Sequence, residues 1–251
     1  MTDLYTITVI SVIYFISCIY ASSVGSGSLL VLPAMLFMGV PATITVATNR
    51  MARLFSSSYA SKRFLDKIKI TQVNLKEILI ATAVGTIAGA MFVISISEAL
   101  LKTIVIAFVV FAGLFVLLFN KKGLKESKPI KIKGRRLIDF IFYSTNGFYR
   151  VIAGTAAGTF VRIYSIVVDG TDFLQASTIA SVLSAFAALI PTIIFIYYGL
   201  IDYPLAISMV VFGIIGTHLG TKLAIEKGNV FIQKLFVIIS FALIGKLLFF
   251  P

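Results

Sequence analysis

Apolar residues fill this chain in long stretches that polar residues interrupt only briefly, from its start to its end. A helix that spans a membrane needs about 20 mostly apolar residues at a rise of about 1.5 Å per residue. The pattern therefore predicts an all-α polytopic membrane protein with about 8–10 transmembrane segments, some of them short discontinuous helices. The predicted segments lie at about 4–23, 25–39, 42–61, 73–96, 98–119, 137–153, 157–171, 173–198, 203–223 and 229–250.

Two of these segments, 25–39 and 157–171, are shorter than a full span. They are either short tilted spans or half-helices that meet a break inside the membrane. A broken backbone is tolerated at that depth only where protein or a water-filled cavity covers it.

Composition narrows the class of protein further. Of the 251 residues 59% are hydrophobic and 13% are charged, and the mean hydropathy is +1.04. Soluble domains carry about 25% charged residues, so a cytosolic enzyme and a disordered chain are both excluded. Residues 1–9 include Asp3 and no Lys or Arg. A cleaved signal begins with a basic region, so the segment 4–23 is predicted to be a retained span.

The basic residues bear on orientation. The chain has 22 Lys and Arg against 10 Asp and Glu, and the polar linker 121–136 alone holds eight basic residues and one acid. Such a loop is typical of the cytoplasmic side, although contact with anionic lipid or a docking partner is an alternative. The linker divides the chain into a first transmembrane repeat, 1–120, and a second, 137–251.

Three landmarks recur in the same order in the two halves, which indicates an internal repeat. Thr48 and Ser177 lie 129 residues apart, and Gly85 and Gly216 lie 131 apart. The landmarks are the glycine runs 25–33 and 154–161, the polar strings 46–49 and 175–178, and the Gly-x-x-x-Gly pairs 85–89 and 216–220.

Loop charge predicts that the two repeats are inverted relative to each other. The loop 62–76 has five basic residues, whereas its counterpart 197–204 has none. The next pair of loops reverses this bias, because 95–98 has no basic residue and 222–228 has two. Cytoplasmic loops favour Lys and Arg, so equivalent loops lie on opposite sides. Inverted repeats are typical of transporters whose substrate site lies near the midplane.

Four arginines lie inside or near predicted membrane segments: Arg50, Arg53, Arg150 and Arg162. Arg50 and Arg53 lie on the order of 12–17 Å into their segment. A charge at the helix centre costs roughly 2.5–3.5 kcal/mol on insertion scales, so each arginine needs a partner. The planar guanidinium matches carboxylate, sulfonate or phosphate oxygens, which favours an anion-binding site. The alternatives are snorkelling to the interface and pairing with Asp169, Asp172 or free carbonyls.

Hydrogen-bond donors and glycines complete the predicted substrate site. Gly25 and Gly27 interrupt a helix and let backbone approach a ligand, although close helix packing explains them equally well. The predicted donors come from the pseudo-equivalent polar strings of the two halves, Thr48 and Asn49 in the first and Ser177 and Thr178 in the second.

No catalytic arrangement is visible in the chain. It has no HExxH, no Walker A motif and no Cys/His metal set, and it contains one Cys and one His. We therefore predict no enzymatic activity, no cofactor and no bound metal.

Read together, these strings are similar to a known family. The order Gly-Ser-Gly-Ser-Leu-Leu-Val-Leu-Pro (25–33), Gly-Val-Pro (39–41), Ala-Thr-Asn (47–49), a basic loop and Gly-x-x-x-Gly, repeated after the linker, resembles the sulfite exporter TauE/SafE family of membrane permeases. The resemblance implies transport of sulfite or organosulfonates across the plasma membrane. The sequence departs from the family at Ser26, Ser28 and Asn49-Arg50, which add donors and positive charge.

The resulting hypothesis is a multi-pass secondary transporter of the plasma membrane that moves a small anion, sulfite or an organosulfonate first, by alternating access. Its partners would be the anion and membrane lipids, with no nucleic acid. A coupling ion, proton or sodium, and a homodimer are left open. An anion channel and a non-transporting membrane scaffold subunit are the alternative functions.

Overall fold

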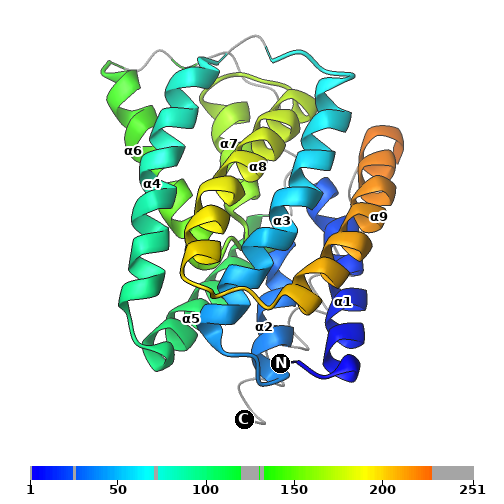
Figure 1. Ribbon diagram of the computed structural model, residues 1–251. Coiled ribbons are helices and arrows are strands. Elements are labelled where there is room, and N and C mark those ends of the chain that lie inside the picture. Colours follow the sequence, from blue (N-terminus) through cyan, green and yellow to red (C-terminus); the bar gives the residue numbers. More distant parts are fainter. Residues whose placement is uncertain (1, 25–26, 71–72, 120–129, 131–132, 228–251) are drawn as a thin grey trace.

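The computed structural model describes residues 2–24, 27–70, 73–119, 130 and 133–227 (Figure 1). Helices without strands make up this part of the chain, which confirms the all-α prediction. The predicted segment 229–250 and most of the linker 121–136 lie outside the described residues. The helices are α1 Leu4–Val24, α2 Ser28–Phe37, α3 Ala42–Leu65, α4 Leu75–Ser95, α5 Glu98–Phe119, α6 Arg135–Ile152, α7 Ala157–Val167, α8 Phe173–Tyr197 and α9 Tyr203–Lys227.

The outer faces of the bundle are apolar, as expected for a protein surrounded by lipid. Among the described residues, α1, α4, α8 and α9 are long and apolar enough to cross a membrane. On α4 the exposed side chains at 80, 84, 87 and 91 are all apolar, and they recur at helical spacing. A stripe of this kind would be unfavourable in water, and it fits hydrocarbon.

Helix α3 is the polar element of the bundle, and its neighbours bury it. It packs mainly against α8 and α9 and carries buried Thr48, Asn49, Arg50 and Ser56. Its N-terminus is capped from another helix, because the carboxylate of Glu98 accepts hydrogen bonds from the first two backbone N–H groups of α3. Polar residues inside a membrane bundle face its interior in this way.

The two short segments form half-length helices. At 1.5 Å per residue, the 10 residues of α2 and the 11 of α7 extend about 15–17 Å, half of a bilayer core. Helices α1 and α2 make one hairpin, and α6 and α7 make another that opens towards the opposite end of the bundle (Figure 1). Neither short helix spans the membrane alone.

Glycines pack the two halves of the chain against each other. A Cβ on Gly85 would lie 1.9 Å from the carbonyl oxygen of Ser144, so α4 and α6 are in backbone contact. Gly216 and Gly220 likewise bring α9 onto the backbone of α1 at Phe15 and Ile19. The Gly-x-x-x-Gly pairs are therefore packing residues, as their spacing favours. Each half thus packs its fourth helix, α4 or α9, against the first helix of the other half, α6 or α1.

Loops with different charge lie at opposite ends of the bundle. The described flanks of the basic loops 62–76 and 121–136 and the end of α9 lie at one end, which we name the basic end (Figure 1). The loops 95–98 and 199–204 lie at the other end. The arrangement matches the segregation that the charge pattern predicts.

Candidate functional site

A small cavity lies inside the bundle, between helices that come from both halves of the chain. Its volume is about 30 Å³, room for one or two water molecules. It is lined by Ala21, Arg53, Ser56, Ser57, Ala60, Gly158, Arg162, Ala180, Ser181, Ser184 and Thr217. Two guanidinium groups and five hydroxyl groups thus face one cavity, and none of its lining residues is acidic.

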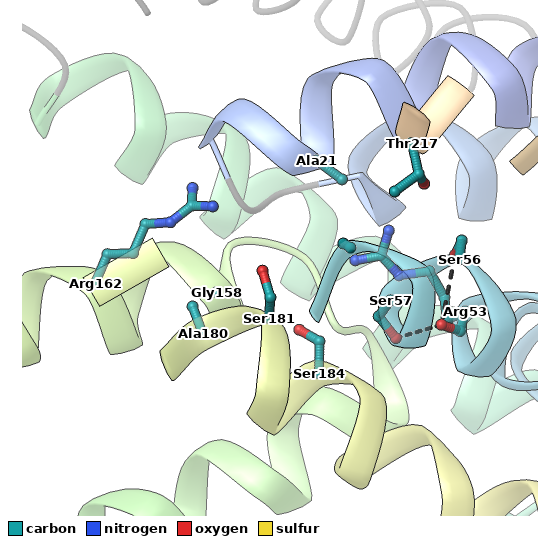
Figure 2. A pocket seen from close by; sticks show the side chains of 11 residues that line it. Ala21, Arg53, Ser56, Ser57, Gly158, Arg162, Ala180, Ser181, Ser184 and Thr217 are labelled. Carbon is teal, nitrogen blue, oxygen red and sulfur yellow. Dashed lines mark hydrogen bonds between the residues drawn. The ribbon is translucent and has the colours of Figure 1, made fainter. Parts of the chain in front are cut away.

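The two arginines reach the cavity from opposite sides. Arg53 extends from the middle of α3 and Arg162 from α7, while Ser181 and Ser184 of α8 lie between them (Figure 2). Gly158 lines the cavity from the first turn of α7, where backbone N–H groups have no partner within the helix. The positive end of the helix dipole therefore lies at the same place as the two guanidinium groups.

Arg50 and Arg53 of α3 each lie against a glycine at one of the two chain breaks. A Cβ on Gly27 would lie 2.8 Å from a guanidinium nitrogen of Arg53, and one on Gly154 would lie 2.6 Å from that of Arg50. Gly154 also has a φ of +62°, which glycine adopts most readily. Helix α3 thus contacts the break before α2 through Arg53 and the break before α7 through Arg50.

Arg150 supports the cavity from behind rather than lining it. Its guanidinium donates to Ser184 Oγ at 2.5 Å and to Asn146 Oδ1 at 3.0 Å. Ser184 lines the cavity, so Arg150 acts on it through that hydroxyl. Arg150 is a buried cation, with 4% of its surface exposed.

Buried positive charge in this region has little compensation. Arg50 is 3% exposed and Arg150 is 4% exposed. Among the described residues, Arg50, Arg53 and Arg150 make no ion pair with a carboxylate. Because an uncompensated charge is costly at this depth, the arrangement favours an anion as the missing partner.

The other predicted site residues serve the fold. Thr48 Oγ1 accepts from the backbone N–H of Asp202 at 3.1 Å and so fixes the start of α9, and Asn49 Nδ2 donates to Ser28 Oγ at 3.4 Å. Ser177 and Thr178 donate to carbonyls of their own helix. None of these four lines the cavity, and Gly25 lies outside the described residues.

The serines of the cavity are the part that the sequence analysis missed. Ser56 and Ser57 follow Arg53 by three and four residues, so helical spacing places them beside it. Ser181 and Ser184 lie three residues apart on α8, so they too share one face of their helix. A search for hydroxyls at i+3 and i+4 from a membrane arginine would have found the first pair.

Known proteins place the chain in a family. Residues 10–247 match the family described as "Sulfite exporter TauE/SafE". The chain belongs to the TauE/SafE family. Because the match covers nearly the whole chain, family membership applies to both halves and to the cavity between them.

Curated relatives of this TauE/SafE protein carry general transporter names. It is 27% identical over 243 residues to "Probable membrane transporter protein YfcA" of Escherichia coli (strain K12), covering 96% of this chain and 90% of the relative. It is 25% identical over 235 residues to "Probable membrane transporter protein" of Haemophilus influenzae, covering 94% and 91%. It is 28% identical over 244 residues to "Probable membrane transporter protein ORF9" of Sinorhizobium sp, covering 94% and 90%. No solved structure matches the chain. The family and these relatives make the protein a membrane transporter of a small substrate.

Proposed function

We propose that this transporter carries a small oxyanion, sulfite or an organosulfonate first, across the plasma membrane by alternating access. The observation that carries the proposal is the cavity faced by Arg53 and Arg162, with five hydroxyls and no acidic residue in its lining. Guanidinium and hydroxyl groups donate hydrogen bonds and do not compete for a cation, so the cavity matches a ligand rich in acceptor oxygens.

The proposed mechanism assigns different roles to the arginines. Arg53 and Arg162 bind the anion from the two sides, and the hydroxyls of Ser181 and Ser184 orient its oxygens. Arg150 positions Ser184, and Arg50 holds the break before α7 against α3. A cavity of about 30 Å³ is too small for a sulfonate, so in this proposal the helices that line it move apart when the anion binds.

Inverted repeats would supply that movement. The two hairpins α1–α2 and α6–α7 open towards opposite ends of the bundle, and the halves exchange helix contacts through α4–α6 and α9–α1. Both features support a pair of inverted repeats around one central site. In this proposal the basic end is cytoplasmic, because Lys and Arg favour that side.

Uptake into liposomes tests the proposal. The purified protein is reconstituted, and uptake of labelled sulfite, taurine and sulfate is measured for the wild type, Arg53→Ala and Arg162→Ala. Arg136→Ala is the matched control, because Arg136 is an exposed arginine far from the cavity. We expect saturable uptake of sulfite or taurine by the wild type and the control, and its loss in both cavity variants.

Several outcomes would contradict the proposal. Uptake that never saturates and cannot be driven uphill would indicate a channel. Absence of uptake for all three anions, across a range of proton and sodium gradients, would exclude this substrate class. Full uptake by both cavity variants would mean that the cavity does not bind the substrate.

A further inference from the structure

A second group of donors lies beside the central cavity, where α3 packs against α9 (Figure 1). Ala60 of α3 and Thr217 of α9 line the cavity. Arg63 follows Ala60 by three residues on the same face of α3, and His218 follows Thr217 directly. Both helices run towards the basic end, so these residues lie between the cavity and that end. We name Tyr59, Arg63 and His218 the α3–α9 cluster.

Two donors in this cluster share one acceptor. A terminal guanidinium nitrogen of Arg63 and the hydroxyl of Tyr59 each lie 2.7 Å from Nδ1 of His218. A charged guanidinium can only donate, so Nδ1 accepts, and the proton of the neutral imidazole is on Nε2. The ring nitrogen has a single lone pair. An additional acceptor oxygen would therefore give each of the two donors a hydrogen bond of its own.

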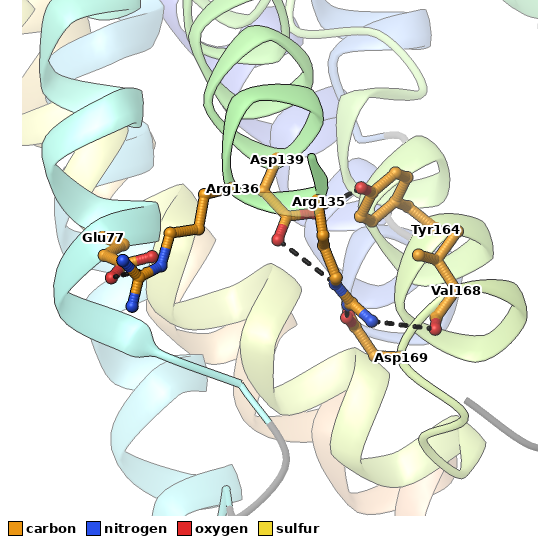
Figure 3. A network of polar contacts seen from close by, with 7 residues as sticks. All are labelled: Glu77, Arg135, Arg136, Asp139, Tyr164, Val168 and Asp169. Carbon is orange, nitrogen blue, oxygen red and sulfur yellow. Dashed lines mark hydrogen bonds and ion pairs between the residues drawn. The ribbon is translucent and has the colours of Figure 1, made fainter. Parts of the chain in front are cut away.

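Arg63 also lacks the kind of partner that Arg135 has at the same end of the bundle. Arg135 donates to Asp139 at 3.3 Å and to the carboxylate of Asp169 (Figure 3). Among the described residues, Arg63 makes no ion pair with a carboxylate. Its positive charge meets a neutral ring nitrogen instead. The arrangement leaves that charge open to an anion.

A proton on His218 would reverse the contact. A protonated imidazole donates from both nitrogens and has no lone pair, so Nδ1 could no longer accept from Arg63 or Tyr59. Two cations would then face each other where 2.7 Å now separates their nitrogens. An oxyanion between them removes this repulsion, because its oxygens accept from all three side chains. The anion and the proton therefore each favour the binding of the other.

We propose that the α3–α9 cluster is a second anion-binding site of this transporter, at which the oxyanion binds together with a proton on Nδ1 of His218. The proposal rests on the proposed function for the identity of the anion. The proton comes from water at the basic end and forms an N–H bond at Nδ1, and no covalent bond of the protein breaks. The site lies one helical turn from the cavity along α3, so it places the anion on the way to Arg53.

The position of the cluster gives it access to both ligands. His218 is exposed, and it lies five residues, or about 8 Å, before the end of the apolar stretch Tyr203–Leu223. Other charged or titratable groups on the elements packed around it, within the described residues, are Lys62 and Asp66 of α3 and its end, Tyr14 and Cys18 of α1, and Lys222 of α9. The one acid in this set, Asp66, is exposed and makes no ion pair with Arg63.

Titration calorimetry of the whole protein in detergent tests the proposal. The probes are methanesulfonate and sulfate, because neither anion changes its own charge between about pH 5 and 8, the range in which histidines titrate. Titrations in buffers with different ionisation enthalpies give the number of protons taken up for each anion bound. We expect the wild type to take up protons on binding. Its affinity should fall as the pH rises, because neutral His218 has no N–H at Nδ1 to donate.

Three variants assign the effect to the cluster. His218→Gln should bind the anions with no proton uptake and with an affinity that does not depend on pH. Arg63→Gln should also lose proton uptake, and its affinity should fall about tenfold, as expected for one charged hydrogen bond. Lys62→Gln is the matched control, because it removes an exposed positive charge next to Arg63 and should keep the proton uptake.

A fourth variant separates the cluster from the central cavity. Arg53→Ala removes a cavity arginine and leaves the α3–α9 cluster intact. The binding that remains in this variant should still take up protons, and the further change His218→Gln should abolish that uptake. Loss of all proton-linked binding in Arg53→Ala would mean that the cluster does not bind an anion by itself, which overturns the proposal.

The remaining outcomes separate this inference from the proposed function. Anion binding without proton uptake in the wild type, or proton uptake that survives His218→Gln, would overturn the second site, while saturable uptake of sulfite or taurine into liposomes would still support the proposed function. Proton uptake that requires His218, in a protein that carries no anion into liposomes, would leave the second site standing and reject transport. Failure of the wild type to bind either probe at any pH would overturn the second site.

Discussion

Two groups of arginines in this protein differ in their partners. At the basic end, Arg135 and Arg136 each meet a carboxylate from another element or the next helical turn. In the centre, Arg50, Arg53 and Arg150 meet only hydroxyl, amide or backbone groups among the described residues. The paired arginines join helices, whereas the central ones keep an excess of positive charge. The contrast supports the proposal that the first group serves the fold and that an anion completes the second.

The largest expected effect is a loss of transport, without a loss of stability, when an arginine of the central cavity is replaced. Arg53→Ala and Arg162→Ala should each reduce apparent affinity for sulfite or taurine at least tenfold, since a charged hydrogen bond contributes about 1.5–3 kcal/mol. Arg53→Ala should not lower the free energy of unfolding in detergent, because Arg53 makes no ion pair with a carboxylate among the described residues. Sulfite should raise the melting temperature of the wild type and not that of either variant.

Loss of stability in Arg53→Ala would contradict the comparison, because this central arginine would then be structural like the outer ones. Arg53→Lys is the matched variant. It keeps the charge but loses the planar fork, so we expect weakened rather than abolished uptake.

The opposite result is expected for Arg135→Ala. Its loss leaves the buried carboxylate of Asp169 without its guanidinium, which should cost about 2 kcal/mol of unfolding free energy. The double variant Arg135→Ala/Asp169→Asn should recover part of that loss, because the buried charge is gone and only the partly exposed carboxylate of Asp139 is left without Arg135. Thermal unfolding in detergent of the wild type, the single variant and the double variant measures both changes. Equal stability of the single and double variants would show that the ion pair is not what holds α6.

The sequence predicts where the helices lie, but it does not predict which side chains line a common cavity. Apolar runs locate helices because the bilayer fixes their length, and even the half-helices α2 and α7 begin at the glycine breaks that the sequence marks. The glycine pairs also predicted close packing correctly. Which helices pack against each other depends on the tertiary arrangement, and neither the hydrophobic periodicity nor the length of a segment predicts it.

The predicted donors and arginines show what helical spacing leaves open. Arg50 and Arg53 are three residues apart, so their directions differ by about 60° around the helix. That is enough to send Arg50 to Gly154 and Arg53 to Gly27 and the cavity. Ser177 and Thr178 repeat the polar string of α3, yet their hydroxyls return to carbonyls four residues earlier on their own helix. Such local bonds compete with ligand binding, and residue type alone does not reveal them.

A smaller effect on stability is expected at Gly154, because the absence of a side chain there leaves room for the Arg50 guanidinium. In Gly154→Ala the alanine must adopt an unfavourable positive φ, and its methyl group meets the Arg50 guanidinium. Together these should lower the free energy of unfolding by about 2 kcal/mol. Gly39→Ala is the control, because Gly39 also has a positive φ but nothing lies within 4 Å of its Cβ position. The difference in unfolding free energy between the two variants measures the close contacts of the new methyl group, with the Arg50 guanidinium at 2.6 Å and the Arg150 carbonyl oxygen at 3.0 Å. Equal losses would mean that Arg50 moves aside freely.

The smallest effect on stability is expected for Arg136→Ala. It tests whether an ion pair stabilises the fold even when its arginine is exposed to solvent. Arg136 faces Glu77 at 3.7 Å, but its side chain is 89% exposed. Exposed pairs contribute about 0–1 kcal/mol, because water and salt screen them. Arg136→Ala should therefore change unfolding free energy by less than about 0.5 kcal/mol and leave anion uptake unchanged. A loss as large as that of Arg135→Ala would show that the exposed pair of Arg136 and Glu77 also holds the bundle together, so that exposure would not decide which arginine is structural.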